Sequence, residues 1–499
     1  MPTPIIAAAD EATRLPRVLG PLAALCVVVG SVIGSGIFIV PAGVARNVPF
    51  LGGIAAVWVI GGLFSLAGAL TLAELGTMLP DAGGPYVYLR EAFGRLPAFL
   101  FGWSELLIIR TGSIATLASA FGLYFGLLVP PRWGISPLAW QTGAAVTATI
   151  LVALINARGT RAGGGVQVAG TALKVGALVS MIALPILLGR LDPALLTPLW
   201  ADRPGLGLVG GVTAAMVSVL WAYDGWVNAA NLAEEIRDPG RNIPRALIGG
   251  MIGLIAIYLA MTATYHMVLP FGEVTSASST KGSPKIVAAD FFAHLLGPVG
   301  LTLIAVVVMA STLISLNGNA LSGPRAYFAM ARDGLFPAGL CRVHPRFRTP
   351  ANAIAVQAAW AVLLLVAGAA LLLIEPPGSG SGWPAPVLRA WRKLHATPLY
   401  DVMFTYVIFG GTLFYTAAIA SVFVLRRTRP DLPRPYRTWG YPWTPGIYLA
   451  GASLLLGSML VESPSESLAG LAIIAAGLPG YWLFNRRRGA GPAGGSALT

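Results

Sequence analysis

Long apolar runs separated by short polar segments make up almost the whole chain. About 20 apolar residues are enough for a helix to cross a bilayer, and these runs predict about twelve such spans. The expected spans are residues 18–44, 52–79, 97–129, 137–156, 164–188, 206–236, 245–270, 298–330, 350–374, 398–425, 444–460 and 467–484. The pattern therefore predicts an all-α, polytopic membrane protein.

Two of these spans are interrupted near their centres by small and polar residues. The first holds Gly30, Gly34, Ser35 and Gly36, and the sixth holds a polar stretch over residues 221–226. Glycine costs a helix about 1 kcal/mol relative to alanine. Backbone groups freed by a break are tolerated in a membrane only where they are buried in protein or line a watery cavity. Breaks at matching positions in two halves indicate a transporter built from inverted repeats.

The domain organisation follows from the position of the breaks. Each broken span is the first of five, which predicts one repeat over residues 18–188 and a second over 206–425. Residues 444–484 then form two additional spans, residues 1–17 an N-terminal segment, and residues 485–499 a tail. With both termini placed in the cytoplasm, the inside loops carry more than twice as many Arg and Lys residues as the outside loops. By the positive-inside rule we expect a cell-membrane protein in this orientation.

Composition and charge exclude several classes of protein. Only 11% of residues are charged, against roughly 25% in soluble proteins. The net charge of +13 is explained by the basic loops and lipid headgroups, so no nucleic-acid partner is expected. The two cysteines and four histidines form no catalytic or metal-binding cluster, so the sequence predicts no enzyme, no cofactor and no metal site.

Two facing helix breaks suit a zwitterion. A half-helix N-terminus offers free N–H groups and partial positive charge to a carboxylate, and a C-terminus offers carbonyls to an ammonium. Glycine at the first break allows a carboxylate to approach the backbone. The alternative for Gly30 and Gly34 is helix packing through small residues; we place the carboxylate near Gly34, Ser35 and Gly36 and leave Gly30 open to packing.

Several motifs are similar to those of one transporter family. They are Gly34-Ser35-Gly36-Ile37-Phe38 with Pro41, Trp103-Ser104-Glu105 through Arg110, Trp221-Ala222-Tyr223-Asp224-Gly225-Trp226, Glu234-Glu235 through Pro244, Asn317-Gly318 with Arg325, Arg332-Asp333-Gly334, and Arg429 through Tyr436. Together they resemble the amino acid–polyamine–organocation superfamily, and more closely its L-type amino acid transporter branch. The resemblance implies a leucine-transporter-like 5+5 inverted repeat with discontinuous first and sixth helices and alternating access.

The resemblance also implies roles for residues at the two breaks. It places Ser35 and Gly36 on the substrate carboxylate. The α-amino group would lie on the backbone around Ile33 and around Trp221, Ala222 and Gly225. Trp221 would be an aromatic gate over the substrate, with packing as the alternative. Asp224 would orient the broken segment or contact the amino group; helix capping is an equal alternative.

Ionisable residues inside the spans are the remaining candidates. Lys174 is expected to be functional because a charge inside the bilayer is costly. The resemblance implies that it takes the place of a sodium ion and ties the fifth span to the first; proton transfer and a purely structural bond are alternatives. Arg110 and Glu105 are five residues apart, so we predict that they do not pair within one helix. Both are expected to make structural or gate contacts, and Arg110 is a candidate gate residue. Glu234 is a candidate inner gate, although end anchoring of Glu234, Glu235 and Arg325 is the simpler prediction.

The helix breaks predict a zwitterion site, and the resemblance implies a sodium-independent secondary transporter of L-amino acids, most simply neutral ones, working by exchange, facilitated diffusion or proton-coupled uptake. Alternatives are transport of polyamines or cationic amino acids by the same fold, or nutrient sensing without transport. L-type transporters that pair covalently with a glycoprotein subunit use a cysteine in the loop after the third span. Residues 130–136 contain none, so no disulfide-linked heavy subunit is expected, and membrane lipid is the expected surrounding.

Overall fold

The computed structural model describes residues 14–200, 207–277, 279–280, 283–284, 286–374, 383–384, 388, 392, 399–462 and 464–489. The predicted N-terminal segment 1–17 is therefore described only from Arg14, and most of the predicted tail 485–499 lies outside the described residues.

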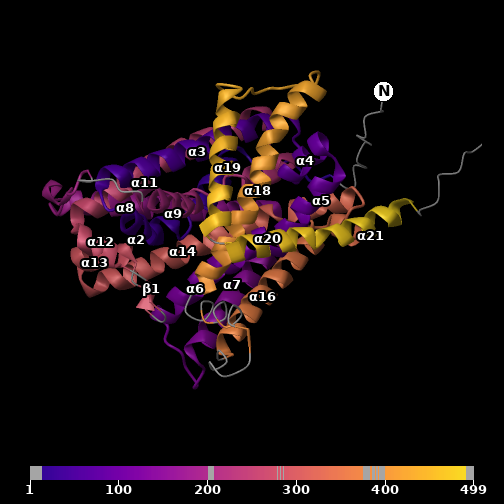
Figure 1. Ribbon diagram of the computed structural model, residues 1–499. Coiled ribbons are helices and arrows are strands. Elements are labelled where there is room, and N and C mark those ends of the chain that lie inside the picture. The colour runs from indigo at the N-terminus through magenta and orange to yellow at the C-terminus, as the bar shows by residue number, and fades with distance from the viewer. Residues whose placement is uncertain are drawn as a thin grey trace, which may run out of the picture.

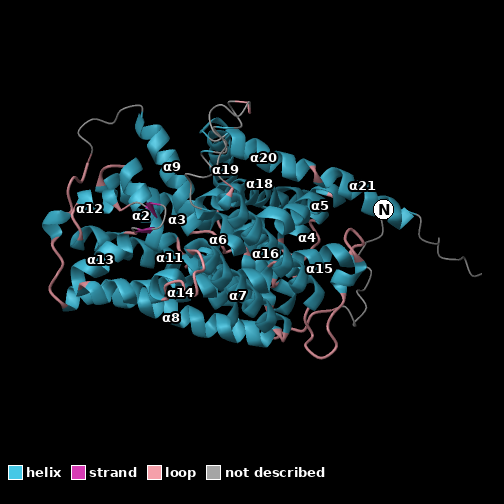
Figure 2. Cartoon of the chain, turned by 90° about the horizontal axis from the view of Figure 1, so that it is seen from below, coloured by secondary structure: helices cyan, strands magenta, loops and turns pink. Residues whose placement is uncertain are grey.

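Almost every described residue belongs to a helix or to a short connection between helices (Figure 2). The elements of the first half are α1 (Pro21–Val32), α2 (Gly36–Asn47), α3 (Leu51–Met78), α4 (Pro85–Phe93), α5 (Arg95–Ser104), the π-helix η2 (Glu105–Ile109), α6 (Arg110–Leu128), α7 (Pro137–Ala157), α8 (Thr160–Leu187), η3 (Pro193–Leu195) and α9 (Gly207–Ala222).

The second half continues the same architecture and adds one small antiparallel hairpin. Its helices are α10 (Asn228–Asn231), η4 (Ala233–Glu235), α11 (Pro239–Val268), α12 (Phe271–Ser276), α13 (Val287–Leu296), α14 (Pro298–Ser322), α15 (Pro324–Arg332), η5 (Ala338–Cys341), α16 (Ala351–Leu373), α18 (Leu399–Thr428), α19 (Trp443–Glu462), α20 (Pro464–Ala475) and α21 (Gly477–Gly489). The hairpin pairs β1 (Ser279–Thr280) with β2 (Ser283–Pro284).

The membrane spans agree with the hydrophobic pattern. Among the described residues, ten helical segments are long and apolar enough to cross a membrane, and α1 with α2 forms an eleventh span that bends by 42° at its break. The predicted sixth span is represented by the shorter α9, which ends at the second break. The polytopic all-helical fold is thus confirmed, while the count of twelve and the inverted repeat stay predictions.

The first helix lies in the interior of the bundle, where it contacts α8, α11 and α14. Figure 2 shows α8 and α14 side by side along their length, and Figure 1 shows α18 and α19 as a long antiparallel pair. An aromatic cluster supports this interior: the rings of Trp58, Tyr223 and Tyr258 lie 5.1–5.8 Å apart, centroid to centroid. The two broken segments are therefore enclosed by protein on several sides.

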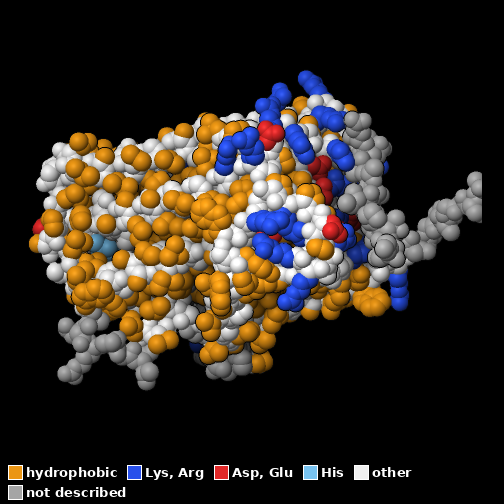
Figure 3. Space-filling view, turned by 90° about the horizontal axis from the view of Figure 1, so that it is seen from above, with side chains coloured by type: hydrophobic (Ala, Val, Ile, Leu, Met, Phe, Trp, Pro, Cys, Tyr) orange, Lys and Arg blue, Asp and Glu red, His pale blue; other side chains and the backbone are white. Residues whose placement is uncertain are grey.

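The surface divides into an apolar part and a basic end. On the face seen from above, hydrophobic side chains cover the left and central parts, and Lys and Arg side chains gather toward the right (Figure 3). Large apolar side chains such as Leu63, Leu151 and Leu454 are more than half exposed. Such exposure is costly in water but not in hydrocarbon, so this surface is suited to a lipid bilayer.

Candidate functional site

The first break separates α1 from α2 at Ile33, Gly34 and Ser35. Ile33 leaves the helical conformation at ψ 84°, and α2 begins again at Gly36. The first N–H groups of α2 have no partner inside the helix. A Cβ on Gly36 would lie 2.7 Å from the Cα of Ala222, so glycine is required there for the two broken segments to touch.

The second break follows α9 and occupies residues 223–227. Gly225 has φ +118°, and a Cβ there would lie 3.0 Å from the carbonyl carbon of Ser31. The hydroxyl of Tyr258 lies 3.2 Å from the Val32 oxygen and 3.1 Å from the Ala222 oxygen. One phenol thus bridges the carbonyl ends of both half-helices, a contact that sequence reasoning missed.

A small cavity of about 30 Å³ lies between the two breaks. Six of the predicted site residues line it: Gly34, Ser35, Gly36, Trp221, Asp224 and Gly225. A water molecule needs roughly 10–15 Å³ of such volume, so the cavity has room for about two waters. An amino acid can enter only if the surrounding residues move, and Trp221, which is 8% exposed, is one of its walls.

Two predicted site residues lie behind the cavity, and others were not predicted. Ile33 and Ala222 are buried and contribute backbone oxygens. The unpredicted wall residues are Ser31, Val32, Ser113, Leu117 and Asn319. Gly30 serves packing, because a Cβ there would lie 2.1 Å from the Thr171 hydroxyl.

Lys174 on α8 binds the carbonyl end of α1. Its ammonium donates to the Gly30 oxygen at 2.7 Å, the Ile33 oxygen at 2.5 Å and the Ser315 hydroxyl at 2.7 Å. An ammonium has three donors, and here each has an acceptor. The lysine is 3% exposed, so the predicted tie between the fifth span and the first is present as a set of hydrogen bonds.

Two hydroxyls on α14 complete the support of the first break. The Ser315 hydroxyl lies 3.1 Å from the backbone oxygen of Gly30 and 2.9 Å from that of Ile33. The Ser311 hydroxyl lies 3.2 Å from the backbone oxygen of Ile33 and 3.0 Å from that of Gly34. The sequence carried a signal for them: Ser311 and Ser315 are four residues apart in an apolar helix, and so share one face.

The prediction that Arg110 and Glu105 do not pair is wrong. Their side chains form a buried ion pair, with Nε and Nη2 of Arg110 at 2.8 and 2.6 Å from Oε1 of Glu105. The reason is the π-helix η2, whose hydrogen bonds run from residue i to i+5 and bring residues five apart onto one face. The same guanidinium donates to the amide oxygens of Asn228 and Asn319, so it joins α6, α10 and α14 beside the cavity.

Side chains outside the π-helix form hydrogen bonds with its backbone carbonyls. Tyr327 donates to the backbone oxygen of Glu105 at 3.2 Å, and Trp360 donates to the backbone oxygen of Leu107 at 2.9 Å. Thr111 donates to the Leu106 oxygen at 2.6 Å. These donors bind carbonyls in and around the turn, and two of them come from α15 and α16.

Glu234 and Glu235, which follow the second break, each form an ion pair with an arginine of α15. Glu235 pairs with Arg325 at 2.7 Å, and both side chains are at most 1% exposed. Glu234 pairs with Arg332 at 3.1 Å and accepts hydrogen bonds from the backbone N–H groups of Leu15 and Ala82. The predicted gate residue Glu234 therefore connects the N-terminal segment, the α3–α4 loop and α15.

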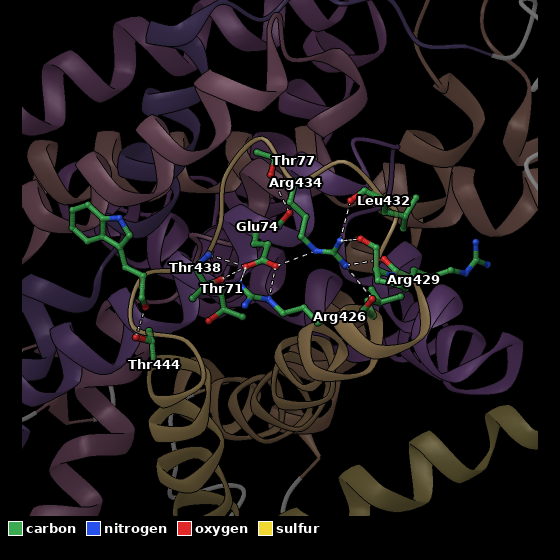
Figure 4. A network of polar contacts seen from close by, with 12 residues as sticks. Thr71, Glu74, Thr77, Arg426, Arg429, Leu432, Arg434, Thr438 and Thr444 are labelled. Atoms are coloured by element: carbon green, nitrogen blue, oxygen red, sulfur yellow. Dashed lines mark hydrogen bonds and ion pairs between the residues drawn. The ribbon is translucent and has the colours of Figure 1, made fainter.

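A second carboxylate cluster fastens the loop between α18 and α19 to α3 (Figure 4). Glu74 is completely buried and receives two hydrogen bonds from Arg426, at 2.8 and 2.6 Å. It also accepts the backbone N–H and the hydroxyl of Thr438, each at 2.7 Å. Arg434 folds the loop by donating to the carbonyls of Leu425, Arg429, Pro430 and Leu432.

Asp224 borders a second cavity as well as the first. This cavity measures about 40 Å³ and is walled by aromatic and hydroxyl groups, among them Trp226, Tyr415, Tyr448 and Thr412. An acidic side chain that borders two small cavities offers a place for a positively charged group. Within the part of the chain that the structure describes, no three His, Cys, Asp or Glu side chains are grouped as metal ligands.

Comparison with known proteins agrees with this arrangement. The family model for amino acid permeases matches residues 19–478. The chain is 32% identical to the Serine/threonine exchanger SteT of Bacillus subtilis over 96% of this chain and 99% of that protein. It is 29% identical to the human b(0,+)-type amino acid transporter 1, over 95% of this chain and 89% of that protein.

A further relative is the human Large neutral amino acids transporter small subunit 2, which is 30% identical over 94% of this chain and 80% of that protein. These alignments include both helix breaks, because they cover nearly the full length of the chain. The chain belongs to the amino acid permease family.

Proposed function

We propose that this protein exchanges small neutral L-amino acids across the cell membrane without sodium. The observation that carries the proposal is the position of the Lys174 ammonium, which binds the α1 carbonyls and Ser315. A fixed ammonium there supplies the positive charge that a bound metal cation would otherwise supply. The exchange activity named for the Bacillus relative supports the same mechanism.

The substrate would bind with its carboxylate at the start of α2, near Gly34, Ser35 and Gly36. The positive end of the α2 helix dipole favours an anion there. Its ammonium would lie at the carbonyl ends of α1 and α9, where Val32 and Trp221 line the cavity. The small cavity favours a short side chain, and Trp221 would close over the substrate as a gate.

A cationic amino acid is the second candidate substrate, and Asp224 favours it. Its carboxylate borders both cavities, so a long side chain with a terminal cation could extend from the first cavity into the second. Competition by L-lysine against labelled L-serine separates the two candidates. Inhibition that is lost in Asp224→Asn would favour a cationic substrate, and no inhibition would favour the neutral one.

The experiment is uptake of labelled L-serine into proteoliposomes, with and without internal L-serine, sodium and a pH gradient. We expect uptake to require internal substrate and to be unchanged by sodium. Lys174→Ala should lower exchange at least tenfold, whereas Leu173→Ala, a 60% exposed neighbour on the same helix, should leave it unchanged. Exchange of no amino acid, or exchange that needs sodium, would refute the proposal.

We further propose that both termini lie in the cytoplasm and that no disulfide-linked subunit is needed. The basic end of the molecule in Figure 3 supports the orientation through the positive-inside rule. Both cysteines are free, with Cys26 buried and Cys341 partly exposed. Labelling of Arg14→Cys and Arg132→Cys in intact cells with an impermeant maleimide tests the orientation: only Arg132→Cys should react.

A further inference from the structure

A large apolar groove on the membrane-facing surface lies away from the substrate cavity. It measures about 600 Å³ and is formed by α6, α7 and α14. Its lining includes the small residues Gly143, Ala144 and Ala148 of α7 and the aromatic residues Phe121, Phe125 and Trp140. We call this the α7 groove.

The lining of the α7 groove is chemically suited to a hydrocarbon chain. Its two polar side-chain groups are already bonded: the Trp140 N–H to the Val129 oxygen at 2.8 Å, and the Thr147 hydroxyl to the Gly143 oxygen at 2.8 Å. No lining side chain therefore needs a polar partner. The wall along α7 runs from Ala139 to Ile155, which at 1.5 Å per residue is about 24 Å. Half of a roughly 30 Å hydrocarbon core is about 15 Å, so a complete acyl chain fits along it.

The exposed cation Arg132 lies in the turn next to one lining residue of the α7 groove, Ile135. Ile135, which lines the groove, donates its backbone N–H to the Arg132 oxygen at 3.2 Å, so the two residues share one turn. Arg132 is exposed, and no carboxylate of a described residue forms an ion pair with it. Trp133, 83% exposed, lies in the same turn, as expected of a residue at the headgroup level.

We propose that the α7 groove is a phospholipid-binding site. One acyl chain lies along α7 against the small residues, and the lipid phosphate pairs with the Arg132 guanidinium. The glycerol backbone lies beside Trp133 and Trp140, whose rings are 6.2 Å apart. The site is separate from the amino acid site and holds a lipid of the leaflet that meets residues 129–136.

The test is native mass spectrometry of the full-length protein in detergent, titrated with palmitoyl-oleoyl phosphatidylglycerol. Gly143→Phe places a ring in the groove, and its Cβ meets no atom within 4 Å. Gly176→Phe is the matched control on α8, where a Cβ also meets no atom within 4 Å. Gly143→Phe should raise the lipid concentration for half occupancy about tenfold, the effect of losing roughly two buried methylene groups.

The headgroup contact is tested by Arg132→Gln, with Arg158→Gln at the other end of α7 as its control. One basic residue near a headgroup is worth about 1 kcal/mol, so we expect about a fivefold loss of affinity in Arg132→Gln alone. Equal binding by Gly143→Phe and Gly176→Phe would overturn the site. Unchanged binding by Arg132→Gln would overturn the phospholipid assignment, as would a polypeptide that copurifies in place of lipid.

Discussion

Replacing the buried carboxylate of Glu74 by an amide should loosen the loop between α18 and α19. Both carboxylate oxygens of Glu74 accept bonds, from Arg426 on one side and from Arg426 and Thr438 on the other. Glu74→Gln keeps the size of the side chain but removes its charge and turns one acceptor into a donor. That N–H₂ group then faces N–H donors, so at least one hydrogen bond is lost. Arg426 also loses its counter-ion, as does Arg434, whose Nε lies 3.5 Å from Oε1 of Glu74.

The expected cost follows from the exposure of the two partners. Removing one member of a fully buried ion pair costs about 3–5 kcal/mol. Glu74 is completely buried, but the Arg426 side chain is 22% exposed and stacks 3.7 Å from the centre of the Tyr441 ring. Arg426 thus keeps some water and a cation–π contact, and we expect a loss nearer to about 2–3 kcal/mol.

The assay is thermal unfolding of the purified protein followed by tryptophan fluorescence. With an unfolding entropy of about 2 cal/mol/K per residue, that loss lowers the midpoint by at least about 2 °C in a chain of this length. The matched control is Glu91→Gln, which pairs with Arg90 at 3.0 Å and with Arg429 at 3.4 Å. All three of these side chains are at least 20% exposed, so each pair should be worth less than about 1 kcal/mol. Equal midpoints for the two variants would refute the argument that Glu74 anchors the loop.

Three further outcomes follow from the same geometry. Gly36→Ala should abolish substrate binding, because the added Cβ would push α2 away from α9. In the control Gly43→Ala, the only atom within 4 Å of the added Cβ is at 3.9 Å, so this variant should bind substrate normally. Binding of labelled L-serine to the purified proteins distinguishes the two variants. Glu105→Gln leaves Arg110 buried without its counter-ion and should cost about 3 kcal/mol in thermal unfolding; an unchanged midpoint would contradict this. Glu234→Ala should speed tryptic cleavage of the N-terminal segment, and an unchanged rate would mean that its contacts do not hold that segment.

The spans and the first break could be predicted because they depend on local sequence. A run of apolar residues has few alternatives to a membrane helix, and glycines weaken a helix wherever they stand. Lys174 was identifiable for a similar reason, since a charge inside a span must have partners. The sequence could not show which partners, because the Gly30 and Ile33 oxygens become acceptors only after α1 breaks beside α8.

The misjudged pair of Glu105 and Arg110 shows where local reasoning fails. Residues five apart are separated on an α-helix, and nothing in the stretch 105–109 itself requires a π-turn. The turn depends on donors such as Tyr327 and Trp360, which belong to α15 and α16. Tyr258 was missed for the same reason: a tyrosine in an apolar helix carries no sign of the two carbonyls that it will bridge.

The support of α1 by α8 has a consequence for how this protein can diverge. Gln167 and Thr171 donate to the Cys26 oxygen, and Lys174 donates to the Gly30 and Ile33 oxygens. These bonds end on main-chain atoms of the first helix, which every residue type possesses. Mutations that change side chains along α1 can therefore leave these hydrogen bonds intact, except at Gly30, where a Cβ would lie 2.1 Å from the Thr171 hydroxyl and 2.5 Å from the Gln167 amide nitrogen. Elsewhere on α1, side chains that line the cavity can change substrate preference while the main-chain support of the helix is kept.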